Sequence, residues 1–445
     1  MRATKNIEFR NGVHPPESKG LTAGLSIRRL PFPAEIIIPL GQHIGAPAKA
    51  CVRPGDRVER GDKVAEAQGF VSVPHHASAT GTVTEISRFP HPNGTYSQAI
   101  RIEVDPYSAQ QARARSIVDW ETLSVEEIVA AVQEAGVVGL GGAAFPTHVK
   151  LRPPEGESVD CLIVNGCECE PYLTTDHRVM VEYPDRVRNG IRIMLRCLGA
   201  RRAIVGIEKN KPDAIKALED ATRGDDDIEI VPLRVRYPQG AEKMLLKALI
   251  DREVPIGKLP VHIGAVVQNV GSIATIAEAF ETGLPLLERV VTVTGTGVAE
   301  PANLLVPIGT RLRVLIEACG GLTDGASEVI LGGPMMGTSV GDLDAPVLKG
   351  TTGVLVLSQR ETQARRTYPC IRCGHCLDAC PVFLNPQALG SLAKSLRYDE
   401  MGEDHNLATC MLCGCCSYVC PSNIPLSQMF QVSKQALAKA KATQR

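Results

Sequence analysis

The sequence has no long uninterrupted apolar run and almost no net charge. Its most apolar region, residues 259–280, is interrupted by His262, Gln268 and several glycines, so we expect strand, loop and helix there rather than a membrane span. No apolar stretch near the first residues has the form of a signal peptide. The formal net charge of −1 gives no reason to expect nucleic-acid binding. We therefore expect a protein that is soluble or peripherally attached to a membrane.

Cysteine, by contrast, is abundant, with 15 in a chain of 445 residues. The pattern C-x2-C-x2-C-x3-C-P occurs at 370–381 and again at 410–421. This is the ligand spacing of bacterial ferredoxins with two [4Fe–4S] clusters, in which the fourth Cys of each motif binds the other cluster. The predicted ligands are Cys370, Cys373, Cys376 and Cys420 for one cluster, and Cys410, Cys413, Cys416 and Cys380 for the other.

A pair of structural zinc sites is the alternative explanation for these cysteines. Such sites usually have two C-x2-C pairs separated by a long loop, and neither motif has that form. Cys415 could replace its neighbour Cys416 as a ligand, but the C-x2-C register favours Cys416. Cluster thiolates also indicate a reducing compartment. The pattern predicts a chain that carries single electrons.

The order of sequence patterns predicts a multidomain α/β protein that begins with an all-β module at 1–107. In that module, Gly-Asp turns at 55–56 and 61–62 separate short apolar runs. The arrangement resembles the barrel-sandwich fold of biotinyl and lipoyl domains, which carry an acceptor Lys at a hairpin tip. The tip here, at 66–70, has no Lys, so we expect a docking or scaffolding role.

Residues 120–288 alternate between predicted strands and helices, which indicates an α/β layer with a largely parallel sheet. One helix is expected to follow the strand at 161–164 and run through Met194, and another is expected to begin at Ser272. Ser124 and Glu127 predict a capping box at the first helix, and Gly136 is placed to end it. Shorter strands and turns over 289–358 are typical of a small β-grasp-type domain.

A mainly helical two-cluster module is predicted over 359–445, with one helix between the motifs from Pro386 to Arg397. The Lys-rich end at 434–441 is expected to be a solvated helix end, with a membrane or partner contact as the alternative.

A glycine-rich loop and a Lys occupy residues 139–150 (GLGGAAFPTHVK). Glycines let backbone N–H groups approach a phosphate, but the loop is neither a Walker motif nor a G-x-G-x-x-G fingerprint in its usual frame. Taken alone, it could equally be a structural turn. Polar residues follow predicted strands at 165–171, 237–242 and 268–272. Because the carboxyl ends of parallel strands meet at one sheet edge, we expect these segments to converge with the loop on one cleft.

The motifs Gly-Gly-Ala-x-Phe-Pro-Thr, Asn-x-x-Glu-x-Glu-Pro, Tyr-x-x-Gly-x-Glu and Asn-Val-x-Ser/Thr occur in this order. They resemble the flavin-binding, NADH-oxidising subunit of respiratory complex I. A closer resemblance is to the C subunits of Rnf ion-translocating NADH:ferredoxin oxidoreductase complexes, which share segments 12–19, 39–47 and 333–337 and both ferredoxin motifs. This resemblance covers nearly the whole chain. It implies a barrel-sandwich domain, an FMN/NADH-binding α/β domain, an SLBB-like β-grasp domain and a two-[4Fe–4S] domain.

The resemblance also implies where FMN and the nicotinamide nucleotide bind. Lys150 would lie near the FMN phosphate or ring, Phe145 would stack on the nucleotide, and Glu170 would bond to its ribose or amide. The residues implied for the whole site are Gly139, Gly141, Gly142, Phe145, Lys150, Asn165, Glu168, Glu170, Tyr237, Gly240, Glu242, Asn269 and Ser272.

Three residues depart from the complex I pattern. Leu140 replaces an Arg, Ala144 replaces the Gly before Phe, and Cys167 replaces an Asp. The added Cβ of Ala144 is expected to tighten access for the nucleotide.

The implied function is electron input to a membrane-bound, ion-translocating NADH:ferredoxin oxidoreductase. NADH gives two electrons as hydride and clusters accept one at a time, so FMN must connect them. Hydride transfer needs no side-chain acid or base, so no catalytic side chain is predicted. The implied partners are other Rnf subunits, including integral-membrane ones, with ferredoxin or flavodoxin as ultimate acceptor or donor. The implied location is peripheral, on the cytoplasmic face of the bacterial inner membrane.

Three alternatives remain at the level of sequence. The first is a flavin and iron–sulfur cobalamin reductase, although such proteins tend to begin at the flavin domain. The second is an electron-transfer protein of an amino-acid reductase. The third is a scaffold that binds clusters only for structure.

Overall fold

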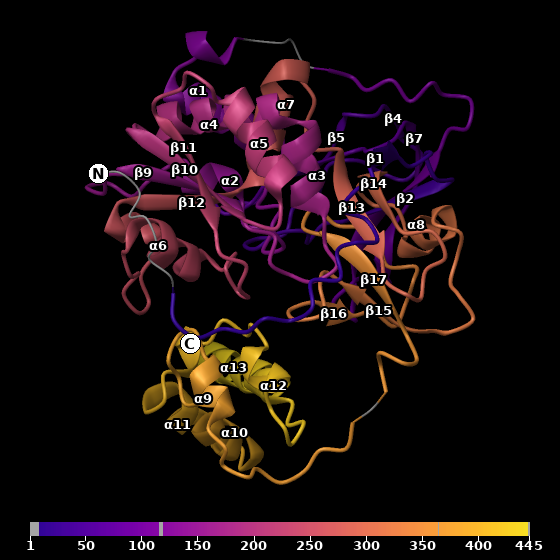
Figure 1. Cartoon of the computed structure of the whole chain (residues 1–445). Coiled ribbons are helices and arrows are strands. Elements are labelled where there is room, and N and C mark those ends of the chain that lie inside the picture. The colour runs from indigo at the N-terminus through magenta and orange to yellow at the C-terminus, as the bar shows by residue number, and fades with distance from the viewer. Residues whose placement is uncertain (1–8, 115–118, 364, 444–445) are drawn as a thin grey trace.

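The computed structural model describes residues 9–114, 119–363 and 365–443. Figure 1 shows a large upper body of sheets and helices, with a smaller helical module below it at the C-terminal end of the chain. Within the described residues, no helix is both long enough and apolar enough to cross a membrane.

The N-terminal module is built from two facing antiparallel sheets. One has the strand order β2-β8-β7-β4 and the other β3-β5-β6. Isoleucine and valine side chains from both sheets form its core, as expected for a barrel-sandwich. The strands are β2 (Glu35–Pro39), β3 (Lys49–Ala50), β4 (Arg57–Val58), β5 (Lys63–Glu66), β6 (His75–His76), β7 (Gly81–Pro90) and β8 (Tyr96–Val104).

The central domain has a four-stranded sheet, with order β11-β10-β9-β12, in which all neighbours are parallel. Its strands are nearly continuous apolar runs because helices cover both faces. Helix α6 packs on one face, and α1, α3, α4, α5 and α7 supply the core on the other. The strands are β9 (Cys161–Gly166), β10 (Arg202–Glu208), β11 (Ile228–Leu233) and β12 (Ala265–Asn269). The helices are α1 (Val125–Glu134), α2 (Thr147–Lys150), α3 (Thr175–Glu182), α4 (Pro184–Leu198), α5 (Pro212–Ala221), α6 (Glu242–Ile250) and α7 (Val270–Thr282).

A six-stranded mixed sheet forms the third domain, in the order β1-β14-β13-β17-β15-β16. Strand β1 (Ile27–Arg29) comes from the start of the chain and pairs in parallel with β14. The other elements are β13 (Glu288–Thr294), β14 (Ala302–Pro307), α8 (Leu312–Ala318), β15 (Ala326–Leu331), β16 (Thr338–Ser339) and β17 (Gly353–Ser358).

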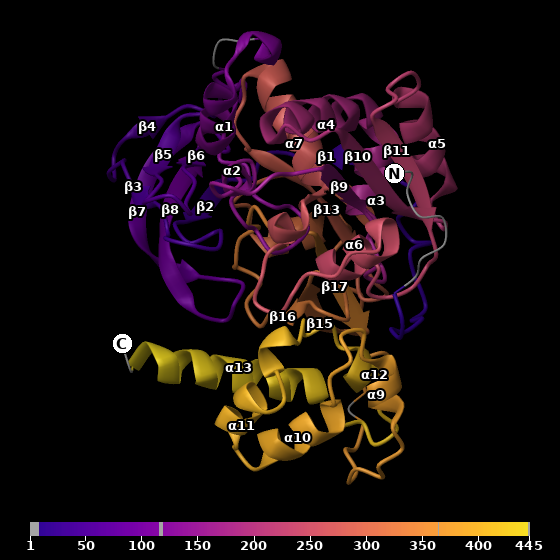
Figure 2. The same cartoon turned by 90° about the vertical axis from the view of Figure 1, so that its left-hand side faces the viewer.

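The C-terminal module is helical, and its last helix extends below the upper body in Figure 2. The two cysteine motifs have matching backbones. Arg372 and Leu412 adopt left-handed φ values of 56° and 57°, and Gly374 and Gly414 precede the short helices. The helices are α9 (His375–Ala379), α10 (Pro386–Lys394), α11 (Tyr398–Glu403), α12 (Cys415–Tyr418) and α13 (Leu426–Thr443).

The predicted fold class is confirmed, as are the parallel sheet and the Ser124–Glu127 capping box. Two predicted helices differ from the structure. The helix expected to open at Ser272 begins at Val270, because the side chain of Asn269 accepts the Ser272 N–H and caps it earlier. The single helix expected to run through Met194 is two helices, α3 and α4, with Pro184 at the start of the second.

Candidate functional site

A cavity of about 720 Å³ opens at the carboxyl edge of the parallel sheet. It lies where β9 and β12 are neighbours, and the chain crosses there from one half of the sheet to the other. Asn165 and Asn269 are paired across these two strands, and both line the cavity. Open α/β sheets bind ligands at such a switch point, because the loops diverge there and leave a crevice.

Most residues that the sequence predicts for FMN and NADH meet at this cavity. Those that line it are Gly141, Gly142, Asn165, Glu168, Glu170, Tyr237, Gly240 and Asn269. Five others do not line it: Gly139, Phe145, Lys150, Glu242 and Ser272.

The glycine loop is closed at its base by backbone hydrogen bonds that join Gly139 to Ala144 and Phe145 at the other end of the loop. The Gly139 N–H donates to the Phe145 carbonyl at 2.8 Å, and the Ala144 N–H donates to the Gly139 carbonyl at 3.1 Å. This turn projects Gly141 and Gly142 into the cavity, where both are exposed. Backbone N–H groups at such a tip can approach a phosphate without side-chain interference. The backbone of Phe145 therefore helps to close the loop at its base, outside the cavity lining.

The other residues outside the lining support it. Ser272, in the first turn of α7, accepts a hydrogen bond from the Leu140 N–H at 2.7 Å and so ties the loop to the helix. Lys150 donates to the Val267 carbonyl at 2.8 Å and lies 3.7 Å from a carboxylate oxygen of Glu242. In this structure these residues brace the loop and the edge of β12.

Three carboxylates, Glu168, Glu170 and Asp176, line the cavity. Two of them, Glu168 and Asp176, are linked at the start of α3. Glu168 accepts hydrogen bonds from the N–H groups of Asp176 at 2.9 Å and His177 at 3.3 Å, so it caps this helix. Asp176 in turn accepts a hydrogen bond from the Asn269 amide at 2.6 Å. Burial, together with the negative charge of Glu168, raises the pKa of Asp176 to about 7.

The third carboxylate, Glu170, reaches toward the β-grasp domain. It accepts the Met335 N–H at 3.0 Å and lies 3.5 Å from the Tyr237 hydroxyl. The fit is close, since a Cβ added to Gly333 would lie 2.2 Å from a Glu170 carboxylate oxygen. Burial raises the pKa of Glu170 to about 7, so its charge changes near neutral pH.

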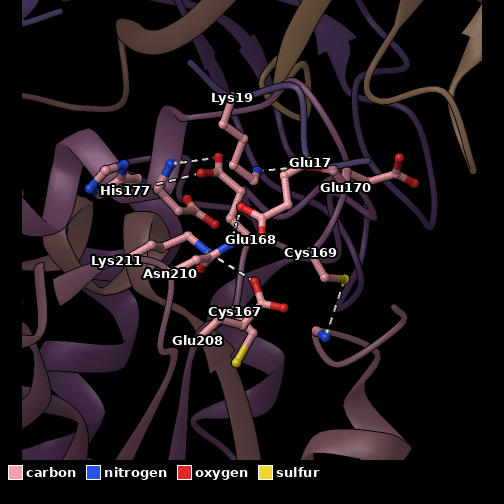
Figure 3. A network of polar contacts seen from close by, with 12 residues as sticks. Glu17, Lys19, Cys167, Glu168, Cys169, Glu170, His177, Glu208, Asn210 and Lys211 are labelled. Carbon is pink, nitrogen blue, oxygen red and sulfur yellow. Dashed lines mark hydrogen bonds and ion pairs between the residues drawn. The ribbon is translucent and has the colours of Figure 1, made fainter. Parts of the chain in front are cut away.

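Buried cations balance these carboxylates, as Figure 3 shows for the part around Glu168. Lys211 and Glu208 form an ion pair at 2.9 Å whose side chains are 1% and 2% exposed. Arg289 is also buried and donates to the carbonyls of Leu140 and Lys349. Burial lowers the pKa of Arg289 to about 10, although Asp176 and Glu168 oppose that shift.

Substituting Glu170 tests this electrostatic description. Because its pKa rises from 4.5 to about 7 on folding, the folded chain binds the proton more tightly, and stability falls as pH rises between these values. Glu170→Gln cannot titrate in this way. Between pH 5 and pH 8 its free energy of unfolding should therefore rise by up to about 3 kcal/mol relative to that of the native chain. Thermal unfolding followed by the fluorescence of Trp120, the one tryptophan, measures this. The exposed Glu103→Gln is the control, and equal pH profiles for the two variants would contradict the assignment.

The eight motif cysteines surround two further cavities. The first, of about 210 Å³, is lined by Cys370, Cys373, Cys376 and Cys420. The second is lined by Cys380, Cys410, Cys413, Cys415 and Cys416. The structure therefore groups the motif cysteines in the crossed sets that the spacing predicts. Both motifs also direct a backbone N–H at the sulfur of the first cysteine, from Arg372 to Cys370 and from Leu412 to Cys410, each at 3.4 Å.

This arrangement fits clusters better than single ions. In the described part of the chain, no three His, Cys, Asp or Glu side chains converge closely enough to hold one metal ion. In a cubane each Cys binds a different iron, so four thiols must surround a space instead of meeting at a point. The Cys415 thiol is fully buried beside Cys413 and Tyr237, within the small apolar cluster at the domain junction.

Comparison with known proteins agrees with this domain order. Four family descriptions match in sequence: the RnfC barrel sandwich hybrid domain at 7–107, the Nuo51 FMN-binding domain at 132–278, the SLBB domain at 290–339 and the 4Fe-4S dicluster domain at 366–424.

The chain is also similar to curated relatives over most of its length. It is 46% identical to the C subunit of the proton-translocating ferredoxin:NAD(+) oxidoreductase complex of Clostridium ljungdahlii, covering 90% of this chain and 87% of that protein. It is 41% identical to the Na(+)-translocating counterpart of Acetobacterium woodii, covering 89% of each. The C subunit of the ion-translocating oxidoreductase complex of Rhodobacter capsulatus is 40% identical, with 98% and 84% covered. The chain belongs to this C-subunit family.

Membership in the C-subunit family favours the Rnf interpretation over the cobalamin-reductase and amino-acid-reductase alternatives. The fold is also found in an NAD+-reducing [NiFe]-hydrogenase, with a TM-score of 0.51, 20% sequence identity, and 74% of this chain and 63% of that chain covered. At that identity the likeness shows the shared fold alone.

In this C-subunit family member, several residues that line the large cavity were not predicted from the sequence as part of the FMN and NADH site. Gln42, His43 and Ile44 enter from the barrel-sandwich module, although the shared segment 39–47 had marked that region. Met336 and its neighbours enter from the β-grasp domain. Met411 and Cys413 enter from the cluster module. All four domains therefore contribute to one cavity, and only the α/β part had a recognisable ligand-binding pattern.

The residues present fit a flavin nucleotide. The cavity has an exposed glycine tip for a phosphate, amide side chains at both strand ends, and a wall of small residues that includes Gly240, Gly333 and Gly350. A Cβ at Gly240 would lie 2.4 Å from the Cys167 carbonyl, so the backbone is packed tightly there.

Proposed function

We propose that this chain oxidises NADH, or reduces NAD+, as the electron-input subunit of an Rnf-type, ion-translocating NADH:ferredoxin oxidoreductase. The family assignment, the FMN-binding domain and the dicluster domain support this proposal. Bound FMN supplies the conversion between a two-electron hydride and single electrons. The relatives belong to multi-subunit complexes, so we expect ion translocation to reside in integral-membrane partners. We place this chain on the cytoplasmic face of the membrane.

The observation that carries the proposal is a wall shared by two cavities. Met411 and Cys413 line both the large cavity and the cavity formed by the second set of cysteines. The Tyr237 hydroxyl donates to the Cys413 carbonyl at 2.8 Å and joins the two domains at this wall. A flavin and the cluster held by Cys413 would therefore be direct neighbours, as single-electron transfer requires.

The positions of the two cysteine sets also suggest the order of transfer. Cys413 is buried, whereas Cys370 and Cys373 of the other set are exposed, and Ile371 between them is 68% exposed. We propose that electrons move from the flavin to the cluster of Cys413, then to the cluster of Cys370, and from there to a partner subunit. In the reverse reaction the order reverses.

The proposed site assignments follow from this placement. Gly141 and Gly142 would hold the FMN phosphate, and Asn165, Asn269 and Gly240 would complete its cradle. Glu170 would face the nicotinamide nucleotide beside the β-grasp domain. The five predicted residues that do not line the cavity, Gly139, Phe145, Lys150, Glu242 and Ser272, would act by holding the loop and strand edge in place.

Anaerobic titration of the reconstituted protein with NADH tests the function. We expect the flavin absorbance and the broad iron–sulfur absorbance to bleach in turn, and the EPR signals of two reduced clusters to appear. A protein that binds both cofactors but is not reduced by NADH would contradict the proposal and favour the scaffold.

A further inference from the structure

The opening segment of the chain runs between the α/β domain and the cluster module. Figure 1 shows this indigo segment passing from the left of the molecule toward the central sheets, just above the yellow helices. None of the described residues 9–19 lines the large cavity or either of the two cysteine cavities. Its contacts indicate a different use.

On one side the segment is joined to the α/β domain by main-chain hydrogen bonds. The Val13 N–H donates to the Tyr237 carbonyl at 2.8 Å, and the Tyr237 N–H donates back to the Val13 carbonyl at 2.9 Å. Just before these bonds, the Arg236 guanidinium lies over the Phe9 ring and donates to the Phe9 carbonyl at 2.9 Å. Tyr237 lines the large cavity, so the segment is attached to its wall.

On its other side the same segment holds the cluster module. The Gly12 N–H donates to the Ala379 carbonyl at 3.1 Å, and the Asn11 side-chain amide donates to the Cys380 carbonyl at 2.9 Å. Cys380 belongs to the cysteine set next to the large cavity. Three consecutive residues, 11–13, therefore bond to both domains at the place where the two cavities meet.

Farther along, the segment holds the acidic loop that follows β9. Lys19, which is 8% exposed, donates to the carbonyls of Glu170 and Leu173, and the Tyr172 N–H donates to the Glu17 carbonyl at 2.9 Å. The close-up in Figure 3 shows Lys19 reaching into this loop beside Glu168. The segment is therefore anchored at both ends, and its course across the junction is fixed.

The remaining junction is small. The segment contributes Val13 to the junction's buried apolar cluster, whose other buried members are Tyr237, Ala379, Cys413 and Cys415, with Cys169, Met335 and Val419 packed against them. A junction with few buried apolar contacts opens at low free-energy cost. Since the rate of electron tunnelling falls exponentially with distance, even a partly opened junction would slow transfer sharply.

We propose that residues 9–19 form a strap that holds the cluster module at electron-transfer distance from the flavin, with Asn11 and Gly12 as positioning residues. This proposal rests on the proposed function. The strap binds neither cofactor, so its loss should spare cofactor content and flavin reduction while slowing the next step.

Gly12 offers a sharp variant with a matched control. It has φ +82°, and an added Cβ would lie 2.5 Å from the Tyr237 carbonyl oxygen. Gly55, in the barrel-sandwich module, has φ +96°, and among the described residues no atom lies within 4 Å of such a Cβ. Gly12→Ala and Gly55→Ala therefore impose similar backbone strain, but only the first pushes the strap off its partner.

The experiment uses the reconstituted full chain mixed anaerobically with NADH. In Gly12→Ala we expect native flavin and iron content, native flavin bleaching, and cluster EPR signals that appear about tenfold more slowly or worse, the size expected from backbone strain of this kind. Hydrogen exchange at the Tyr237 and Gly12 amides should accelerate in the same variant. Gly55→Ala should match the native protein in all four measurements.

A second variant covers the case in which Gly12→Ala does not fold. Asn11→Asp keeps the shape and the left-handed backbone at φ 65° but replaces the amide donor facing Cys380 by an acceptor. Asn423→Asp is its control, because Asn423 has φ 51° and donates to the Arg366 carbonyl at 3.1 Å within the cluster module and its linker. Cluster reduction should slow in Asn11→Asp only.

The strap proposal would be overturned if hydrogen exchange at the Tyr237 amide accelerates in Asn11→Asp or Gly12→Ala while the clusters are still reduced at the native rate. It would also be overturned if hydrogen exchange stays native in both variants. Failure of NADH to reduce the native protein would instead count against the proposed function.

Discussion

Cys413→Ser is expected to leave the flavin reducible by NADH while neither cluster is reduced. Cys413 lines the cavity of its own cysteine set and also the large cavity, so the variant removes the only predicted cluster ligand that, among the described residues, lines the proposed flavin cavity. Serine preserves size but is a poor ligand for iron, because clusters are held by thiolates. Transfer to an external acceptor through the clusters should fall to background. Stopped-flow absorbance of the flavin and freeze-quenched EPR of the clusters measure the two steps separately.

Cys373→Ser is the matched control for this experiment. Cys373 belongs to the exposed set, so its cluster should be lost while flavin reduction and reduction of the cluster near Cys413 remain. The two variants thus distinguish an ordered relay from two independent acceptors. Reduction of the Cys370 cluster at the native rate in Cys413→Ser would show that the proposed order is wrong.

Lys211→Met is expected to destabilise the α/β domain by about 3–5 kcal/mol, because it leaves the Glu208 carboxylate buried without its cation. Glu208 and Lys211 are 2% and 1% exposed and lie 2.9 Å apart. Burial alone would lower the pKa of Lys211, but Glu208 and Glu168 outweigh it and raise that pKa. Lys211 is therefore charged at neutral pH. Denaturant unfolding followed by the fluorescence of Trp120, which belongs to this domain, measures the loss.

Two further variants test whether the loss of stability in Lys211→Met comes from the unpaired Glu208 carboxylate. Glu208→Gln combined with Lys211→Met removes both charges and should recover part of the lost stability. Arg223→Met breaks the exposed Arg223–Asp220 pair, and a change of no more than about 1 kcal/mol is expected there. A loss in Lys211→Met no larger than in Arg223→Met would mean that Glu208 is not held as a buried ion.

From sequence, the residues predicted for the flavin site could be placed at the edge of the parallel sheet, but no more precisely than that. The junction residues after β9 and β12 were predictable because strand alternation fixes which ends meet, and Asn165 and Asn269 are indeed paired there. The supporting positions of Lys150 and Phe145 were not, since a motif records that a residue is needed but not which way its side chain points. Their placement follows from the hydrogen bond of the Lys150 side chain to the Val267 carbonyl and from the backbone hydrogen bond of Gly139 to the Phe145 carbonyl.

The sequence by itself determined the local chemistry: the cysteine spacing, the strand–helix alternation and the caps depend on residues close together in the chain. Only the tertiary structure decided that Cys413 lines the large cavity, that all four domains contribute to the wall of that cavity, and that residues 11–13 join two of these domains. Most of the bonds across that junction use backbone N–H and carbonyl groups, which every residue type carries. They leave almost no signature in the sequence and become visible only when distant segments are folded together.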